Sequence, residues 1–456
     1  MNFELSPQAA QWRDRMQAFF DTEILPRNRE WHAHVVKRGE PAPFMPALQA
    51  KARAAGLWNL GLPALAAGEP GTRLTNLEYA PIAEILGRVF WASEAFNCHA
   101  PDVPNMITLQ HACTPAQKEQ WLKPLLNGET RSAFAMTEPA VASSDATNIA
   151  CTIAADGNDY VINGRKWFST GAAHPRCSML MVMGRITGGA GDADDGGTGA
   201  GAGASANARA SAGASAGASV GASAVATAAS GINRTGRHSM IMVPMDTPGV
   251  RLVRNIRWMG CDDHVAPIGE LDFVNVRVPK EYLLGKPGDG FKLAQVRLGP
   301  ARVHHCMRSL GLCEMLVQLM MARASERRAF GRMIIDYDTV QRWIAEARVG
   351  IEQARLLTLR CAWLLDRDGH QGAWRDVSLV KIAVPNLLQT IADRAIQVFG
   401  AMGGSDDTPI HQALAWARLL RIGDGPDEVH FRQIFKMERP APWRVADSPY
   451  VIPAPD

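Results

Sequence analysis

The spacing of apolar residues changes twice along the chain, and these changes limit the folds that it can adopt. Up to residue 130, apolar positions follow the period of amphipathic helices. From Arg131 they alternate with polar positions, which is typical of strands. From Phe291 to Met437 the helical period returns. An α+β chain with a helical, a β and a second helical part is therefore expected.

The length of the chain indicates more than one domain. A chain of 456 residues exceeds the size at which a single hydrophobic core stops growing. We expect an N-terminal helical domain at 1–130, a middle β domain at 131–283 and a C-terminal helical bundle at 284–440, followed by a tail at 441–456. Long helices with few breaks predict a four-helix bundle, which often packs one face against another subunit.

Local signals place several elements. Residues 8–24, 43–55 and 76–96 have helical spacing, and Thr114 followed by Pro115 predicts the start of a further helix. In the middle domain, turns are expected at Asp156-Gly157 and Asn163-Gly164, between alternating stretches.

One segment of the middle domain has a different composition. Residues 188–230 are nearly all Gly, Ala, Ser and Thr. Such a segment buries too little apolar surface to offset the entropy lost on ordering it. We interpret residues 188–232, approximately, as a disordered surface insertion between two strands, which is tolerated because the cost of loop closure rises slowly with length.

Composition excludes several classes of protein. The net charge of +3 gives no argument for binding nucleic acid or an anionic membrane. The eight cysteines are scattered without a C-x-x-C pair, so neither a metal site nor a disulfide framework is expected. Reduced thiols and the lack of a basic and apolar leader favour the cytoplasm. The chain contains no run of eighteen apolar residues, so a membrane span is not expected.

Three stretches carry specific motifs. They are "AMTEPAVASSDATNIACTIAADGNDYVINGRKWFSTGA" (135–172), "RRAFGRMIIDYDTVQ" (327–341) and "QVFGAMGG" (397–404). Together they resemble the acyl-CoA dehydrogenase family. The resemblance covers nearly the whole chain outside the insertion, and the order and spacing of the motifs are specific. Details such as "ASSDATN" and "DGPDEVH" are similar to the branch that includes family members 10 and 11. The resemblance implies an N-terminal helical domain, a middle β-barrel-like domain and a C-terminal four-helix bundle. It also implies that the protein binds FAD.

The first stretch implies a flavin site. A flavin needs hydrogen-bond donors at its pyrimidine edge and N5, because these atoms gain negative charge on reduction. By resemblance, Met136 and Thr137 meet the pyrimidine side, Phe168 packs against one face of the ring, and Thr170 approaches N5 with Ser169 beside it. The alternative is that Thr137 and Thr170 are ordinary strand residues.

The loop after Glu138 has one residue more than the commoner family form before Asp145. One of its two serines is expected to face the acyl-CoA or the flavin phosphates. Ser143 is the candidate for the substrate and Ser144 for the cofactor. Asp145 is interpreted as a residue that orders the local turn.

The resemblance also implies that a neighbouring subunit completes the cofactor site, which requires at least a dimer. Six residues are expected in this role: Arg327, Phe330, Gln341, Gln397, Gly400 and Ala401. Arg327 matches an arginine that reaches the pyrophosphate, an anion that a guanidinium binds in forked geometry. Ala401 stands where the family has the second glycine of a Q-x-x-G-G element.

The implied reaction takes a proton from the α-carbon of an acyl-CoA and a hydride from its β-carbon. It needs hydrogen bonds to the thioester oxygen and a poorly solvated carboxylate whose pKa can rise. In most family members the base is a glutamate in a loop after a long helix, where this chain has Asp424 followed by Gly425. Other members use a helix position near Arg302, which is Ala301 here. Asp424 is therefore the candidate base.

Further roles follow from the same loop. Gly425 is expected near the substrate, and Arg302 is expected to hold the loop or the CoA portion. Asp427 matches a position that helps to hold FAD. The alternative for Asp424 is an Asx turn or a helix cap. His304 and His305 are interpreted as structural, because the sequence places no carboxylate partner for them.

These features predict an FAD-dependent acyl-CoA dehydrogenase of fatty acid β-oxidation. Its expected partners are an acyl-CoA substrate, an electron-transfer flavoprotein and further copies of the chain in a homodimer or homotetramer. Two alternatives stay open. An enzyme of the same fold whose reduced flavin meets oxygen would be an acyl-CoA oxidase or a flavin monooxygenase. A chain that has lost catalysis would be an acyl-CoA-binding scaffold.

Overall fold

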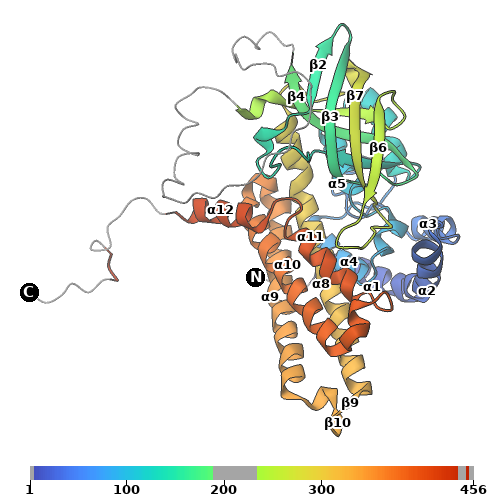
Figure 1. Cartoon of the computed structure of the whole chain (residues 1–456), viewed down its shortest axis with the longest axis vertical. Coiled ribbons are helices and arrows are strands. Elements are labelled where there is room, and N and C mark those ends of the chain that lie inside the picture. The colour runs from blue at the N-terminus through green and yellow to red at the C-terminus, as the bar shows by residue number, and fades with distance from the viewer. Residues whose placement is uncertain (1–4, 188–233, 440–447, 451–456) are drawn as a thin grey trace, which may run out of the picture.

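Three regions of secondary structure follow one another in the computed structural model, which describes residues 5–187, 234–439 and 448–450 (Figure 1). Short helices come first, a β-sheet second and long helices last. This order confirms the α+β class and the helical, β and helical parts. In Figure 1 the sheet lies above the long helices, and the N-terminal helices lie beside the place where sheet and bundle meet.

The N-terminal helices are α1 (Pro7–Phe19), α2 (Asn28–Trp31), α3 (Met45–Ala54), α4 (Asn76–Gly87), α5 (Asp102–Ala112), α6 (Pro115–Gln117) and α7 (Lys123–Leu126). Side chains cap the first backbone N–H groups of three of them, α1, α4 and α6. Reciprocal capping boxes join Thr75 to Glu78 at α4, and Thr114 to Gln117 at α6. The second box confirms the helix start predicted at Thr114.

The prediction of a single helix over residues 76–96 is wrong. α4 ends at Gly87, and a separate 3₁₀ helix covers Ala92–Phe96. The apolar spacing continues through both pieces, because each buries its apolar side chains in the same core. Periodicity alone therefore could not show the break.

The middle region forms one eight-stranded sheet. Its strands are β1 (Arg131–Ala135), β2 (Thr152–Asp156), β3 (Asp159–Thr170), β4 (Cys177–Thr187), β5 (His238–Pro244), β6 (Val250–Ile256), β7 (Ile268–Pro279) and β8 (Leu283–Leu284). They lie in the order β6-β7-β3-β2-β4-β5-β8, and β1 pairs with β4 in parallel. The predicted insertion lies outside the described residues; β4 and β5, which flank it, pair directly in antiparallel register.

One of the two turns predicted in this sheet is confirmed and the other is wrong. Asp156 pairs with Asp159 across a two-residue turn that contains Gly157. Asn163 and Gly164 instead lie inside β3, where the register with β7 shifts. Gly164 has a φ of +152°, and a Cβ there would come within 2.8 Å of Cys151 Cβ. A β-bulge favours glycine at such a position, and so does a turn. The glycine therefore could not distinguish the two, which explains the wrong prediction.

The long helices form the bundle. They are α8 (Gly290–Glu326), α9 (Asp338–Gly372), α10 (Trp374–Phe399) and α11 (Ile410–Leu420), followed by the shorter α12 (Asp427–Glu438). The hairpin of β9 (Arg328–Ala329) and β10 (Arg332–Met333) lies at the end of the bundle farthest from the sheet (Figure 1). In the described part of the chain, no helix combines the length and hydropathy of a membrane span.

One apolar core joins the N-terminal helices to the bundle. Met16 of α1 and Ile82 of α4 belong to the same buried cluster as Val303 and Leu310 of α8. A second cluster lies under the sheet and includes Leu293 at the start of α8. α8 therefore packs against all three regions, and residues in its first half lie where the regions meet.

The backbones of α4 and α8 touch where they cross. A Cβ on Gly87 would lie 1.9 Å from the carbonyl oxygen of Arg308, and one on Gly311 would lie 1.9 Å from that of Glu84. Only glycine permits such an approach. The crossing therefore sets the position of Arg308 relative to α4.

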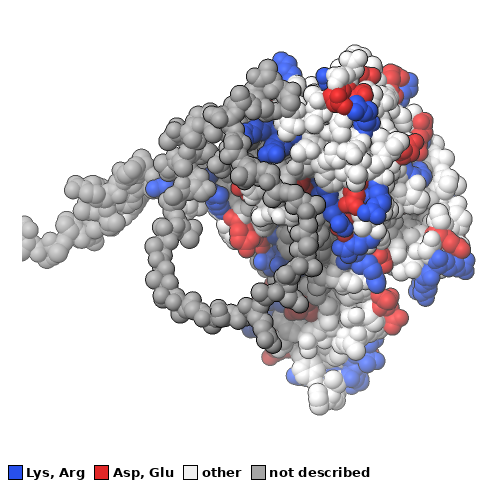
Figure 2. Space-filling model, turned by 45° about the horizontal axis from the view of Figure 1, so that its top comes forward, with Lys and Arg blue, Asp and Glu red and all other residues white. Residues whose placement is uncertain are grey.

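Charged side chains are spread over the surface. Figure 2 shows Lys and Arg interspersed with Asp and Glu over the uncovered part of the face in view. This distribution is in keeping with the low net charge of +3.

Candidate active site

Asp424 lies in the turn between α11 and α12, in a backbone conformation that favours glycine. Its φ is +56°, and that of Gly425 is +104°. A Cβ at Gly425 would come within 3.0 Å of His430 Nε2. α12 starts after Pro426, without a side-chain cap. Asp424 therefore does not cap this helix.

Arg302 holds this turn by its main chain. The Nε of Arg302 donates a hydrogen bond to the carbonyl oxygen of Asp424 at 2.7 Å, and the arginine is buried. The bond ties the turn to α8 and leaves the carboxylate of Asp424 free for other contacts. It is the contact that a loop-holding role of Arg302 requires.

Positive charge surrounds the carboxylate of Asp424. Burial by itself would raise the pKa of Asp424, but the neighbouring His305 ring and the positive charges of Arg297, Lys381 and Arg302 lower it and outweigh burial. The net pKa of Asp424 is therefore below the usual aspartate value, and the rise expected for a poorly solvated base is absent. Asp424 is ionised at neutral pH.

His305 is the direct contact of this carboxylate. Its Nε2 lies 3.5 Å from Asp424 Oδ2, and its Nδ1 lies 3.0 Å from Nη2 of Arg308. Burial, followed by the charge of Arg308, lowers the pKa of His305 to about 3, so the ring is neutral. The sequence placed no carboxylate beside His305, and the fold brings Asp424 to it. His304 instead contacts Asn76 and Tyr79.

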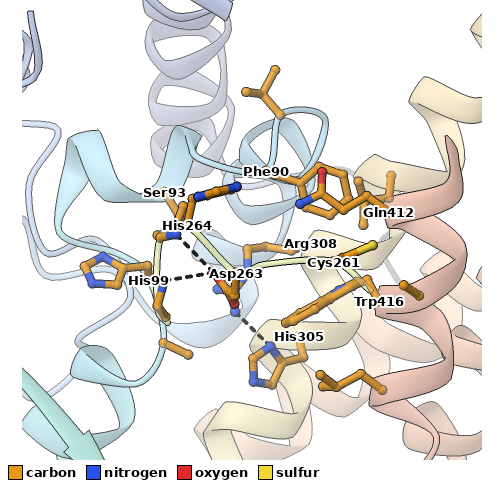
Figure 3. A pocket seen from close by; sticks show the side chains of 18 of the residues that line it. Phe90, Ser93, His99, Cys261, Asp263, His264, His305, Arg308, Gln412 and Trp416 are labelled. Carbon is orange, nitrogen blue, oxygen red and sulfur yellow. Dashed lines mark hydrogen bonds between the residues drawn. The ribbon is translucent and has the colours of Figure 1, made fainter. Parts of the chain in front are cut away.

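A cavity of about 120 Å³ opens beside His305 (Figure 3). Its walls come from the N-terminal helices, the β6–β7 loop, α8 and α11. Polar and aromatic lining residues include Ser93, His99, Trp258, Asp263, His305, Arg308, Gln412 and Trp416. His305 and Arg308 point into the same part of the site in Figure 3, whereas Asp424 is not among the lining residues.

The ends of β1 and β3 lie together. The N–H of Trp167 donates to the carbonyl oxygen of Thr137 at 3.0 Å. Lys166 is fully buried, and its Nζ lies 2.8 Å from both the Met136 carbonyl oxygen and Glu138 Oε1. The hydroxyl of Ser169 is buried and has no hydrogen-bond partner among the described residues.

Phe168 connects these strand ends to the cavity. It has a φ of +47°, and the centre of its ring lies 6.2 Å from that of Trp258. Trp258 lines the cavity and donates to the carbonyl oxygen of Ala415 in α11 at 2.7 Å. Thr170 follows at the end of β3. Of the residues predicted for the flavin, Phe168 thus contacts the cavity-lining Trp258, and Thr170 pairs with Ile268, which also lines the cavity.

The loop after β1 gives its two serines different surroundings. Ser143 Oγ accepts a hydrogen bond from the N–H of Glu138 at 3.0 Å, and Ser144 is exposed. Asp145 accepts from the N–H and hydroxyl of Thr147, which is the turn-ordering role expected of it. Ser144 is the freer of the two serines to meet a ligand.

The residues expected to act across a subunit interface lie elsewhere. Arg327 ends α8, and Gln397 and Gly400 lie at the end of α10, with Ala401 next. Phe330, in the β9–β10 turn, is completely exposed, and Gln341 near the start of α9 donates to the Ile335 carbonyl oxygen. This end of the bundle is opposite to the sheet in Figure 1, so within one chain these residues do not join the cavity.

Asp427 lies close to the turn but is already paired. Its Oδ2 is 2.8 Å from Arg421 Nε and 3.3 Å from Asn386 Nδ2, whereas its buried Oδ1 has no partner among the described residues. One oxygen therefore remains for a ligand.

Comparison with known proteins identifies the family. Models of the acyl-CoA dehydrogenase N-terminal, middle and C-terminal domains match residues 6–129, 133–200 and 288–437. FadE2 of Mycobacterium tuberculosis, described as a probable acyl-CoA dehydrogenase, is 44% identical over 96% of this chain and 97% of its own length. The chain belongs to the acyl-CoA dehydrogenase family.

Further similarities agree with this assignment. A Mycobacterium abscessus protein assigned to the acyl-CoA dehydrogenases has a solved structure that is 41% identical, covers 96% of this chain and 99% of its own, and superposes with a TM-score of 0.82. Acyl-CoA dehydrogenase family member 10 of Mus musculus is 41% identical over 95% of this chain, which spans 37% of that protein. The expected likeness to members 10 and 11 is confirmed.

Membership gives the general chemistry. The acyl-CoA dehydrogenase family consists of FAD-dependent oxidoreductases, so the enzyme class and the cofactor predicted from the sequence are confirmed.

Several residues of the site were missed by sequence reasoning. Arg297, Arg308 and Lys381 surround Asp424 and His305, yet each looked like an ordinary helix residue. Trp258 lies in a loop between strands. The signal that could have identified these cations is their position on the apolar face of a helix. A buried charged side chain is rare unless it is paired.

Proposed function

We propose that this protein is an FAD-dependent acyl-CoA dehydrogenase that introduces a double bond between the α- and β-carbons of an acyl-CoA thioester. Asp424 takes the proton from the α-carbon, and the electron pair of that bond forms the double bond as a hydride leaves the β-carbon. The observation that carries the proposal is the position of Asp424, a half-buried residue with a left-handed backbone that is held by Arg302 and lies beside His305, which lines the cavity.

Several residues near the cavity fit the flavin. The buried, unpartnered hydroxyl of Ser169 would gain a partner from a bound group. Met136 and Thr137 are assigned to the pyrimidine edge, Thr170 to N5, and Phe168 to a face of the ring. When bound, FAD supplies the acceptor for the hydride.

The remaining cofactor contacts are assigned to a second subunit. These residues are Arg327, Phe330, Gln341, Gln397, Gly400 and Ala401. Phe330 is completely exposed in one chain, so it is free to contact a neighbouring subunit. A homodimer or homotetramer is therefore proposed, with Ser144 and Asp427 as further FAD contacts from the first subunit.

Because the pKa of Asp424 is lowered, the site must increase the acidity of the bound substrate. A carboxylate of low pKa is a weak base, so the α-proton must become more acidic in the site. We assign the Asp424 N–H as a donor to the thioester oxygen, where negative charge develops. Arg302, Gly425 and Ser143 are proposed to contact the CoA thioester.

The test is an anaerobic titration of the purified yellow protein with short-, medium- and long-chain acyl-CoAs. The wild type is expected to lose its flavin absorbance with at least one of them, and Asp424→Asn to keep its FAD but not to bleach. Undiminished bleaching in Asp424→Asn would refute the base assignment. Absence of bleaching in the wild type with every chain length would refute the proposed activity and favour a binding scaffold.

We further propose an electron-transfer flavoprotein as the electron acceptor, and a role in fatty acid β-oxidation in the cytoplasm. Mixing the reduced enzyme with oxygen distinguishes this acceptor from the alternative. Slow reoxidation is expected. Fast reoxidation would instead identify an acyl-CoA oxidase or a flavin monooxygenase.

A further inference from the structure

His305 lies between the Asp424 carboxylate and the cavity. His305 is 9% exposed and lines the cavity, whereas Asp424 does not line it. In the described part of the chain, no Lys or Arg nitrogen lies within 4.0 Å of the carboxylate oxygens of Asp424, and His305 Nε2 lies 3.5 Å from Oδ2. The cations nearby therefore act at longer range, and His305 makes the direct contact.

The second nitrogen of the ring determines which tautomer is present. Arg308 Nη2 lies 3.0 Å from His305 Nδ1, and a guanidinium has donors but no acceptor. Nδ1 must therefore accept, which leaves the hydrogen of the neutral ring on Nε2. Oδ2 of Asp424 lies 3.5 Å from this nitrogen, at the outer limit of hydrogen-bond distance, so the hydrogen on Nε2 is available to the carboxylate.

Packing holds this arrangement in place. The Gly87 approach described above fixes the backbone of Arg308 against α4. The His305 ring meets the edge of Trp416 in α11, with ring centres 5.6 Å apart at 66°. Asp424 follows α11 in the chain, so the same helix that packs on His305 delivers the carboxylate to it.

We propose that His305 is a positioning residue for the base. Its Nε2–H holds Oδ2 of Asp424, so that Oδ1 is directed to the α-carbon of the substrate, and Arg308 fixes the tautomer that does this. The inference rests on the proposed function of Asp424.

His305 does not itself take the proton. Nε2 already carries a hydrogen, and the lone pair of Nδ1 is engaged by Arg308. The proton released from the α-carbon goes to the free oxygen of Asp424, and the bond to His305 remains. This division predicts that a side chain with a donor but no basic nitrogen can replace the ring.

Two substitutions separate the hydrogen bond from the volume of the ring. His305→Gln keeps an N–H donor toward Asp424, and His305→Leu keeps bulk without a donor. His304→Gln is the matched control, because His304 is the buried histidine next in the chain and contacts Asn76 instead of Asp424.

The probe is a series of acyl-CoAs of short, medium and long chain in which sulfur replaces the β-carbon. Such a thioester can lose an α-proton but has no hydride to give. Its enolate against oxidised flavin produces a long-wavelength absorption band, which reports proton transfer without turnover. Dissociation constants come from the same titration, and FAD content and thermal unfolding are measured for each variant.

His305→Leu is expected to bind the probe as the wild type does but to form the enolate band about tenfold to a hundredfold less, the loss of one hydrogen bond to a charged group. His305→Gln and His304→Gln should stay close to the wild type. A wild-type band in His305→Leu would overturn the inference, and so would an equal loss in His304→Gln. If wild-type flavin is bleached by no acyl-CoA, the proposed function fails instead.

Discussion

Arg302 donates to the main-chain carbonyl of Asp424 and not to its carboxylate. Two neighbouring turns of α8 thus serve the same aspartate in different ways: Arg302 holds its backbone, and His305 contacts its side chain. Because α8 also packs on the N-terminal helices and the sheet, all three regions contribute to the placement of the carboxylate.

Arg302→Gln should loosen the turn. The variant loses a buried, charge-assisted hydrogen bond worth about 1.5–3 kcal/mol. We expect flavin reduction by a saturating acyl-CoA to slow by about tenfold to a hundredfold, the rate equivalent of that energy, with FAD content retained. Anaerobic stopped-flow absorbance measures the rate. An unchanged rate would contradict a loop-holding role for Arg302.

Gly425→Ala should displace Asp424. The residue has a φ of +104°, and its new Cβ would meet His430 at 3.0 Å. We expect a destabilisation of about 1–2 kcal/mol from the backbone conformation and a marked loss of flavin reduction. Gly423→Ala is the matched control, because its Cβ would meet Leu419 at 3.3 Å or more without a positive φ. Denaturant unfolding and reduction rates should separate the two variants; similar losses would contradict the argument.

The acid limb of the pH profile of flavin reduction should lie at low pH. Burial raises the pKa of Asp424, but His305 and the nearby cations lower it below the usual value. The base therefore stays ionised in mild acid. Lys381→Met removes one cation, so the pKa should rise and the acid limb of flavin reduction should move to higher pH. A limb that stays in place or moves to lower pH would show that Lys381 does not act on Asp424.

The same shift affects stability. A folded-state pKa below the unfolded value stabilises the fold above the unfolded pKa, and this contribution disappears as pH falls through the folded pKa. Asp424→Asn should therefore lessen the loss of stability on acidification across that interval. Unfolding free energies of both proteins, measured as the pH is lowered, check the sign.

Gly311→Ala should separate α4 from α8. Its Cβ would lie 1.9 Å from the carbonyl oxygen of Glu84, so backbone must move. Overpacking of this kind costs about 1–3 kcal/mol or more. Gly404→Ala is the control, since its Cβ would meet nothing within 4 Å. Thermal unfolding should show a lower Tm for Gly311→Ala alone; equal Tm values would contradict the close crossing.

Arg327→Ala should lower FAD content. If Arg327 binds the pyrophosphate of a neighbouring subunit's FAD, the purified variant should contain less FAD per chain and should recover it when FAD is added in excess. Arg328→Ala is the matched control, because Arg328 bonds to the Gly331 carbonyl oxygen within its own hairpin. The ratio of flavin to protein absorbance measures the loss. Equal FAD content in both variants would refute the role.

Local patterns in the sequence were enough for most of the fold. Capping signals such as Thr114 with Gln117 and the period of apolar residues involve neighbours in the chain, so they act before tertiary packing. Where one local signal is compatible with two structures, the prediction was wrong. Gly164 lies at a bulge in β3, not in the predicted turn.

The sequence by itself determined the family, the cofactor and Asp424 as the candidate base, because these depend on motifs that are continuous in the chain. Tertiary structure decided what surrounds that base. His305 has a carboxylate partner only because the crossing of α4 and α8 and the packing of α11 bring distant segments together. The pKa of Asp424 likewise depends on cations from other helices, and the field of such charges follows distance in space, not separation along the chain.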